Sequence, residues 1–375
     1  MEYIALKNIC KINMGQSPDS SSYNDNKDGI PFFQGNADFG EKYPVTRVWC
    51  NAPIKVAQPN DILISVRAPI GALNFAKEEC CIGRGLAALT PDRSKVSLEF
   101  IYWVLKCKKA ELNSKGTGST FKAISRKVLE ETLVPAIDFE KQYEYAEILG
   151  KTYSVIKKYK KELNCLDGLI KARFVEMFGD LRMNTKGWNV KTFDKLSYLI
   201  TDGEHSTPRR ITQGVYLLSA RNILNHSLQL EDVDYIDKEE YERIAKRVVP
   251  QEGDVLISCS GTVGRCCSVP VGVKFQMVRS VALIRFKEEI NHVFAEYMIT
   301  SDYLQEQIKG SQTVSAQANL FQGKIKALKG FVPPIELQNQ FADFVKQVDK
   351  SKVAVQKALD ETQMLFDSLM QEYFG

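Results

Sequence analysis

Two stretches of the chain share one order of hydrophobic and polar residues. NDILISVRAPIGAL occupies residues 60–73, and GDVLISCSGTVGRC occupies residues 253–266. In each, an acidic residue (Asp61 or Asp254) precedes a short apolar run, and a glycine (Gly71 or Gly264) follows at the same spacing. Such a run between an acidic turn residue and small residues predicts a turn, a buried strand and a second turn.

Further matches occur at similar offsets along the chain. Residues 133–137 (LVPAI) resemble 331–335 (FVPPI), Gln142 resembles Gln340, and Phe-Gly occurs at 178–179 and 374–375. Residues 29–33 (GIPFF) resemble 214–218 (GVYLL), and the asparagines Asn36 and Asn222 soon follow them. The pattern predicts a tandem duplication of a unit of about 190 residues, folded as a pseudo-symmetric pair of domains.

A different hydrophobic period begins near residue 139. Residues 139–178 contain no proline, and apolar residues recur every seven positions, with Lys160 and Asp167 interrupting the companion row. This period predicts a long helix with an a/d seam that Gly179 ends. The seam residues that we predict as partner framework here are Leu149, Tyr153, Ile156, Leu163, Ile170 and Phe174.

The second copy repeats this period up to the final Phe-Gly. Its predicted framework residues are Phe341, Phe344, Val348, Val355, Leu365 and Leu369. One alternative is that each helix belongs only to the core of its own domain. The densely charged flanks, such as residues 157–162 (KKYKKE), favour a coiled coil instead. A helix of some 40 residues would be about 60 Å long, so the two would form a stiff rod separating two globular heads.

The remaining segments are rich in Gly, Pro, Asn and Ser, with short β-like runs such as residues 278–286. Helix-like patches at 98–112 and 292–308 make each head α/β or α+β, with an irregular sheet. The predicted division is a first head at 1–134, a long helix at 135–180, a second head at 181–332 and a long helix at 333–375.

Composition narrows the class of protein. The chain has 375 residues, 44% of them hydrophobic and 26% charged, as in soluble globular proteins. Because no apolar run approaches a membrane span and the N-terminus lacks a signal-peptide core, we expect a cytoplasmic protein. Nine cysteines occur without C-x-x-C and with only three histidines, so we expect reduced thiols and no metal site. The net charge of +4 requires any basic surface to be local.

The order of motifs resembles the specificity (S) subunit of type I restriction–modification systems. The residues that carry the resemblance are 201–208 (TDGEHSTP), then 214–222, then 253–264, followed by a Val-Pro-x-Ile segment and a long helix ending in Phe-Gly. The resemblance covers essentially the whole chain. The first head departs from the pattern, because GQSP at 15–18 is shortened and VRAP at 66–69 replaces CSGT at 259–262.

The resemblance implies a function. Each head would be a target-recognition domain that reads one half of a split sequence in double-stranded DNA. The helices, the family's conserved regions, would pair as an antiparallel coiled coil that sets the spacing; about 60 Å equals roughly 17 or 18 base pairs. DNA methyltransferase (modification) subunits would dock on this framework, and restriction/translocase subunits would join through them. S-adenosylmethionine, ATP and Mg would bind those partners, leaving this chain without a cofactor.

Candidate DNA contacts follow from side-chain chemistry. Arg suits guanine, Asn and Gln suit adenine, and Lys and Arg suit phosphates. The first-head candidates are Gln34, Asn36, Arg67, Arg84, Lys122 and Arg126, and those of the second head are Arg209, Arg210, Arg221, Asn222 and Arg265. The alternative for each cation is a solvated side chain or a salt bridge. Gly203 and His205 are interpreted as turn and packing residues.

The sequence also bears on catalysis. The glycine-rich residues 115–120 (KGTGST) lack the spacing of a nucleotide-binding P-loop, and we predict a loop that approaches the DNA backbone. The only Pro-Pro, at 333–334, lacks the neighbours of an amino-methyltransferase motif, and no nucleophile has a plausible histidine partner. We therefore expect a non-catalytic subunit. Two alternatives stay open: a coiled-coil scaffold whose heads bind proteins without reading DNA, and a recognition module of a methyltransferase-only system.

Overall fold

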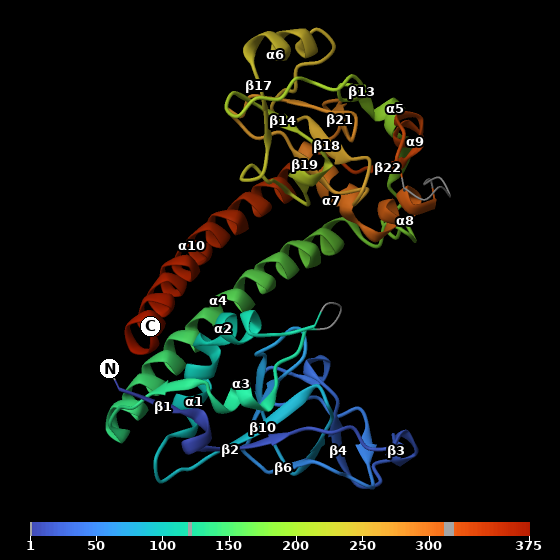
Figure 1. Ribbon diagram of the computed structural model, residues 1–375. Coiled ribbons are helices and arrows are strands. Elements are labelled where there is room, and N and C mark those ends of the chain that lie inside the picture. The colour runs from blue at the N-terminus through green and yellow to red at the C-terminus, as the bar shows by residue number, and fades with distance from the viewer. Residues whose placement is uncertain (1, 119–121, 311–318) are drawn as a thin grey trace. The chain divides into compact units, whose positions relative to one another are not determined.

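The computed structural model describes residues 2–118, 122–310 and 319–375 (Figure 1). It divides into two compact units, each described here by itself. Unit 1 comprises Met1–Lys160 and Lys357–Gly375, and unit 2 comprises Lys161–Gln356. Each unit therefore contains one head and a segment of each long helix. The predicted division into heads and helices follows the elements instead, and it stays a prediction.

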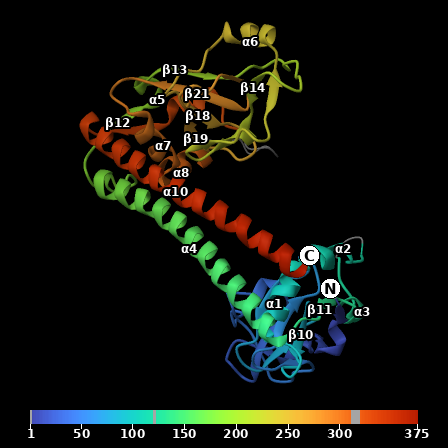
Figure 2. The ribbon, with the colours of Figure 1, turned by 90° about the vertical axis from the view of Figure 1, so that its left-hand side faces the viewer.

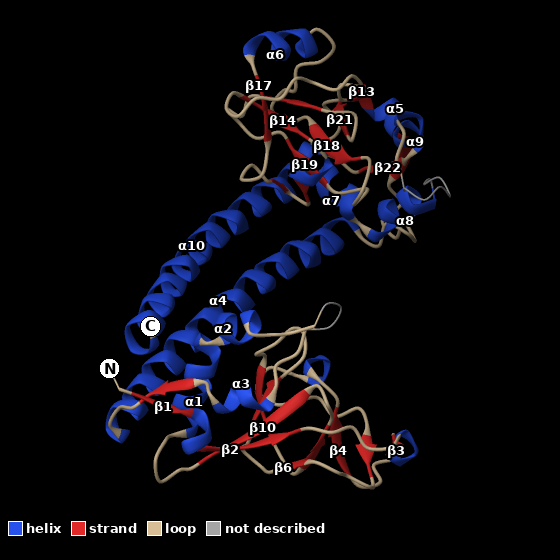
Figure 3. Ribbon diagram, in the orientation of Figure 1, coloured by secondary structure: helices blue, strands red, loops and turns tan. Residues whose placement is uncertain are grey.

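Two sheets form most of the first head (Figure 3). An antiparallel sheet has the order β2-β10-β7-β8 and consists of β2 (Cys10–Met14), β10 (Leu86–Pro91), β7 (Ile62–Ser65) and β8 (Leu73–Phe75). The other has the order β3-β5-β4-β9-β6 and consists of β3 (Tyr23–Asn24), β5 (Trp49–Cys50), β4 (Ile30–Phe33), β9 (Cys80–Ile82) and β6 (Val56–Ala57). Here β4 and β9 are parallel. Strands β1 (Tyr3–Ala5) and β11 (Leu133–Pro135) pair separately, and the helices are α1 (Leu98–Cys107), α2 (Lys109–Ser114) and α3 (Arg126–Glu130).

The second head repeats this plan. Its antiparallel sheet is β13-β21-β18-β19, from β13 (Ser197–Asp202), β21 (Val281–Phe286), β18 (Val255–Ser258) and β19 (Cys266–Ser268). A sheet of β17 (Asp234–Ile236), β14 (Val215–Leu218) and β20 (Phe275–Met277) contains the parallel pair β14–β20. The remaining strands are β12 (Asn189–Thr192), β22 (Lys329–Val332), β15 (Ile223–Leu224) and β16 (Ser227–Leu228). The helices are α5 (Phe193–Leu196), α6 (Lys238–Ala245), α7 (His292–Thr300), α8 (Asp302–Gly310) and α9 (Gln322–Ala327).

The repeated motif forms the same turn in both heads. Asp61 and Asp254 each accept the N–H three residues before them at 2.8 Å. The hydroxyl of Ser65 donates to the carbonyl four residues later at 2.6 Å and accepts the N–H seven residues later at 3.0 Å, and Ser258 makes the same two bonds. The strands between them, β7 and β18, are buried. The predicted turn, buried strand and second turn are confirmed.

Both long helices occur where the heptad pattern predicts them. Helix α4 (Phe139–Phe178) and helix α10 (Ile335–Phe374) have 40 residues each. Gly179 follows α4 with a φ of 79°, a conformation that favours glycine. None of the described helices combines the length and the apolar content that a bilayer span requires.

Within each unit the segments of α4 and α10 pack against one another. In unit 1, Tyr145 stacks on Tyr373 with ring centroids 3.8 Å apart, and α1 lies against the beginning of α4 and the end of α10 through Trp103 (Figures 1 and 2). In unit 2, Phe174 meets Phe341 edge to face, and Asp167 pairs with Lys352 at 2.8 Å. Since residue numbers rise on one segment as they fall on the other, the segments run antiparallel in each unit.

The predicted seam is mostly buried, with one error. The buried members are Leu149, Ile156, Ile170, Phe174, Phe341 and Val348. Tyr153, Leu163, Phe344, Val355 and Leu369 are half-buried. Leu365 is wrong as a seam residue, because it is 53% exposed, whereas the neighbouring Phe366 is buried against Trp103. A row that repeats every 3.5 residues drifts by about 20° per heptad on a straight helix, so by this point the buried face has moved.

Hydrogen bonds also correct the alignment of the two copies. Gln142 bonds the N–H of Ser97 with its side-chain oxygen, at the start of α1. Its counterpart is Gln338, whose oxygen accepts the N–H of Asn291 at the start of α7, and not the exposed Gln340. The Val-Pro pairs that suggested Gln340 are therefore two residues out of register, because proline recurs there without the same structural role.

Candidate nucleic-acid interface

Four of the predicted DNA contacts in the first head lie around one pocket. Gln34, Asn36, Arg67 and Arg84 line a hollow of about 210 Å³ together with Gly35, Ala68 and Gly85. They come from three separate segments: the end of β4, the end of β7 and the turn between β9 and β10. The fold therefore brings together residues that sequence reasoning selected one by one.

Backbone hydrogen bonds explain this convergence. The N–H of Gly83 donates to Phe33 at 2.8 Å, that of Gly85 to Gln34 at 3.1 Å, and that of Val66 to Gly85 at 2.9 Å. A Cβ added to Gly85 would lie 2.4 Å from the carbonyl oxygen of Gln34. Glycine is required there because no side chain fits between the turn and the end of β4.

The pocket carries uncompensated positive charge. Arg67 and Arg84 are exposed, and neither has a carboxylate partner among the described residues. The side-chain amide of Gln34 bonds the hydroxyl of Ser17, at 3.0 and 3.2 Å, in an exposed position. Two guanidinium groups beside amide side chains form a surface suited to both phosphates and base edges.

The other two candidates of the first head differ from each other. The carbonyl of Lys122 accepts the N–H of Ala68 at 3.0 Å, so Lys122 lies next to Arg67 in the fold. Arg126, by contrast, pairs with Glu130 at 2.7 Å on α3. The predicted glycine-rich loop reaches this place, because Thr117 and Ala123 form a bridge beside Arg67, but its residues Ser119 and Thr120 lie outside the described residues.

In the second head, three of the predicted arginines, which follow residues 201–208, are paired with carboxylates. Arg209 pairs with Asp237, and Asp234 holds Arg210 at 2.9 Å and Arg221 at 3.0 Å. The N–H of Glu240, with Arg209 adding to it, holds the pKa of the Asp237 carboxyl below its usual value. The salt-bridge alternative therefore describes these arginines in this conformation, and a phosphate would have to replace a carboxylate.

Asn222 has a structural role instead of the predicted contact. It is fully buried, its side-chain oxygen accepts the N–H of Ser219 at 2.9 Å, and its amide donates to the carbonyls of Gln229 and Asp232. No group of this side chain is left to offer a base. In the first head the same capping role belongs to Asp38, which accepts the N–H of Gln34, and not to Asn36.

Two further arginines of the second head have no carboxylate partner in the described part of the chain. Arg265 is half-buried at the end of the Ser258 turn. Arg279 is exposed, and sequence reasoning missed it. The signal that was available is the similarity of IGRGL at 82–86 to MVRSV at 277–281, which places Arg279 where the first head has Arg84.

Gly203 and His205, which the sequence predicts as turn and packing residues, directly follow β13. A Cβ added to Gly203 would lie 2.3 Å from the carbonyl oxygen of Met277, so this position needs glycine. His205 bonds Asp202 at 2.7 Å on the surface. Among the described residues, no group of three or more His, Cys, Asp and Glu side chains is placed to hold a metal ion.

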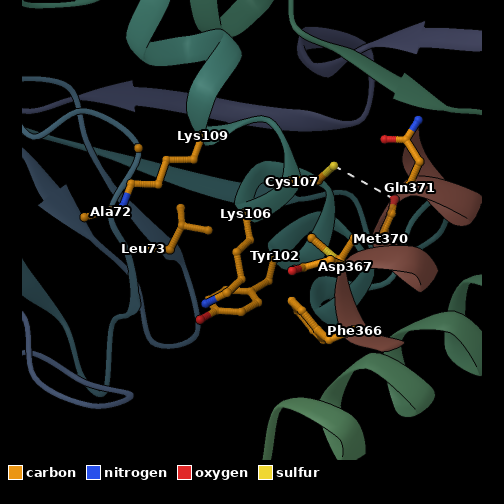
Figure 4. A pocket seen from close by; sticks show the side chains of 11 residues that line it. Ala72, Leu73, Tyr102, Lys106, Cys107, Lys109, Phe366, Asp367, Met370 and Gln371 are labelled. Carbon is orange, nitrogen blue, oxygen red and sulfur yellow. Dashed lines mark hydrogen bonds between the residues drawn. The ribbon is translucent and has the colours of Figure 1, made fainter. Parts of the chain in front are cut away.

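A different pocket lies where the first head meets the end of α10 (Figure 4). Its volume is about 420 Å³, and Tyr102, Lys106, Phe366 and Met370 line it. The ammonium of Lys106 lies 4.0 Å from the ring centroid of Tyr153. Burial raises the pKa of the Cys107 thiol, which points to the carbonyl of Met370. The Lys106 ammonium thus faces an aromatic ring and the Cys107 thiol stays protonated at neutral pH, so both side chains pack the junction between the first head and α10.

Comparisons with known proteins place these features in a family. The family model described as "Type I restriction modification DNA specificity domain" matches residues 1–165 and 209–362. The MjaX type I restriction enzyme specificity subunit of Methanocaldococcus jannaschii is 44% identical over 152 residues, 40% of this chain. The EcoBI specificity subunit of Escherichia coli is 22% identical over 411 residues, covering 99% of this chain and 85% of that protein.

The share of each relative that is matched, and the likeness to a solved structure, bound what these comparisons show. The match spans only 36% of the MjaX subunit. The crystal structure of a type I restriction–modification S subunit from M. genitalium aligns over 100% of this chain and 96% of that chain, with 14% identity and a TM-score of 0.62. At that identity the likeness shows the fold alone: two heads of mixed helices and sheets, each followed by a long helix.

Proposed function

Because the chain belongs to the family of type I restriction–modification DNA specificity domains, we propose that it is the DNA-specificity subunit of such a complex. Each head reads one half of a bipartite target in double-stranded DNA. The observation that carries this proposal is the first-head pocket, in which Gln34, Asn36, Arg67 and Arg84 converge. These residue types recognise base edges and phosphates, and within the described part of the chain the two arginines have no carboxylate to displace.

We further propose that α4 and α10 pair along their length as an antiparallel coiled coil with pseudo-two-fold symmetry. The antiparallel contacts found in each unit support this pairing. So do the equal lengths of the helices and the matching roles of Gln142 and Gln338 at their beginnings. In this arrangement residues 1–134 and 181–332 are the recognition domains, and 135–180 with 333–375 form the framework.

This framework binds the other subunits. DNA methyltransferase subunits dock on the paired helices, and restriction/translocase subunits join through them. S-adenosylmethionine, ATP and Mg bind to those partners, and this chain contributes no catalytic residue. Burial raises the pKa of Cys10 and of Cys259 to about 12 each, so these thiols stay protonated at neutral pH. The complex works in the cytoplasm, where its DNA is found.

A salt titration of the assembled complex tests this function. The chain is purified with the methyltransferase encoded beside it, and its binding to duplex DNA is measured between about 50 and 200 mM salt. We expect the logarithm of the affinity to fall linearly with the logarithm of the salt concentration, because phosphate contacts release counterions. Negligible DNA binding at every salt concentration would favour the protein-binding scaffold. A complex that binds DNA in this way but recruits no restriction subunit when one is added would favour a methyltransferase-only system.

A further inference from the structure

One exposed arginine occupies the same place in both heads. In the first head, the N–H of Leu86 donates to Gly83 at 3.0 Å and closes a turn that contains Arg84. In the second head, the N–H of Val281 donates to Val278 at 2.9 Å and closes the same turn around Arg279. Arg84 and Arg279 are therefore structural equivalents.

Bonds from three neighbouring segments fix this turn identically. The carbonyl after each arginine accepts an N–H from the end of the buried strand, Val66 at 2.9 Å or Cys259 at 2.8 Å. The strand that follows each arginine is also held at its first residue: the N–H of Gly15 donates to the carbonyl of Leu86 in one head, and that of Gly203 to the carbonyl of Val281 in the other, both at 2.9 Å. The two arginines thus start from backbone that the fold holds rigidly, and not from a long loop.

The charge at this place is unpaired in both heads. Among the described residues, seven arginines of the second head have carboxylate partners: Arg182, Arg209, Arg210, Arg221, Arg243, Arg247 and Arg285. Within the described residues, Arg279 has none, and neither does Arg84. Arg265 is also unpaired, but its hydrogen-bonding counterpart in the first head is Ala72. Only the Arg84–Arg279 position thus combines exposure, free charge and repetition among the candidates.

The surroundings of this arginine differ between the heads. Arg67 follows the bonded residue Val66 in the first head, whereas Ser260 follows its counterpart Cys259 in the second. Gln34 and Asn36 are near Arg84, whereas the corresponding segment of the second head is Ser219 to Asn222, with a buried asparagine. The arginine is the same in both heads while the residues around it differ. Its ligand should therefore be one that two different half-sites share, and the sugar–phosphate backbone is such a ligand.

We infer that Arg84 and Arg279 are equivalent phosphate contacts that set the register of each head on DNA. The changed neighbours, with Gln34, Asn36 and Arg67 in the first head, then supply the base contacts. This inference rests on the proposed function and adds a division of labour to it: one shared, sequence-independent anchor in each head beside side chains that carry the sequence preference.

The test uses the complex assembled with its methyltransferase, carrying Arg84→Ala, Arg279→Ala or both. Affinity is measured on a target duplex and on an unrelated duplex over a salt series, and the methylated motif is mapped. Each single change should lower affinity for both duplexes about tenfold and reduce the salt slope by about one, with the motif unchanged. The double variant should lose about two from the slope. Arg84→Lys should keep the slope, because it keeps the charge.

Arg93→Ala is the matched control, since Arg93 is an exposed arginine beyond the other end of β10; it should change neither affinity nor slope. Relaxation of one base in one half-site, with affinity for the unrelated duplex intact, would make Arg84 a base contact and overturn the inference. Unchanged affinity in the double variant would overturn it as well. Failure of the proposed function is seen separately, in a wild-type complex that has no split target.

Discussion

A single carboxylate controls two candidate contacts of the second head. Asp234 binds Arg210 and Arg221, at 2.9 and 3.0 Å. Because exposed pairs of this kind are worth about 0.5 kcal/mol each, Asp234→Asn should raise the affinity of the assembled complex for DNA about fivefold and steepen its salt dependence. Asp232→Asn is the control, since Asp232 is more exposed and lies 3.7 Å from Arg221 alone. Equal affinities of Asp234→Asn and wild type would mean that these arginines face no phosphate.

A buried amide makes the strongest residue-scale prediction for stability. Gln338 is fully buried, accepts the N–H of Asn291 and donates to two carbonyls at 2.9 Å. Gln338→Ala should lower the free energy of unfolding by about 2–3 kcal/mol, because these groups would lose their partner. The exposed Gln340→Ala should cost less than about 0.5 kcal/mol. Urea unfolding of the purified chain measures both; similar losses would show that Gln338 holds nothing together.

These residues show how far sequence reasoning reaches. The sequence alone predicts Gln34, Asn36, Arg67 and Arg84 as DNA contacts, because their side chains have the hydrogen-bonding groups that suit bases and phosphates. It also selected Asn222, since a base-reading amide and a capping amide have the same side chain and only burial separates them. Arg279 is hard to find from the sequence, because IGRGL at 82–86 and MVRSV at 277–281 share no identical residue other than the arginine itself.

At the scale of elements, the prediction concerns the apolar seams of the two long helices. Ile156 is 1% exposed in unit 1, and Val355 is half-buried in unit 2. Aspartate at both positions should break the seam, because a carboxylate without a partner is costly to bury, and assembly with the methyltransferase should be lost. The matched control is Val155→Asp with Val353→Asp, since both side chains point outward, at 37% and 70% exposure. Co-purification with the methyltransferase measures the outcome. Normal assembly of the Ile156→Asp, Val355→Asp variant would show that the seam is not needed to bind the methyltransferase.

Element boundaries were predictable to different degrees. The long helices and the strands around Asp61 and Asp254 followed from period and turn residues, which act locally. The burial of Phe366 in place of Leu365 did not, because a strict heptad row ignores the drift of the buried face along a straight helix, and because Phe366 packs on Trp103 of α1, far away in the sequence. Pairing partners such as the parallel strands β4 and β9 likewise depend on contacts that no local pattern encodes.

At the scale of the whole molecule, the proposed coiled coil acts as a ruler. Seven residues added to each helix lengthen it by about 10 Å, which corresponds to about three base pairs. Insertion of one heptad into both α4 and α10 should therefore change the unread spacer of the target by about that number and leave both half-sites unchanged. Insertion into one helix alone, as the control, should disrupt pairing. An unchanged spacer with both insertions would refute the ruler.

The most direct measurement is a genome-wide map of methylated bases in cells that express this chain with its neighbouring methyltransferase. The account predicts a split motif with two fixed halves and an unread gap of constant length, since each head reads one half. It also predicts that Arg67→Ala alters the half read by the first head and no other, by about 1–3 kcal/mol of discrimination. A continuous motif, or methylation that does not depend on this chain, would contradict the account.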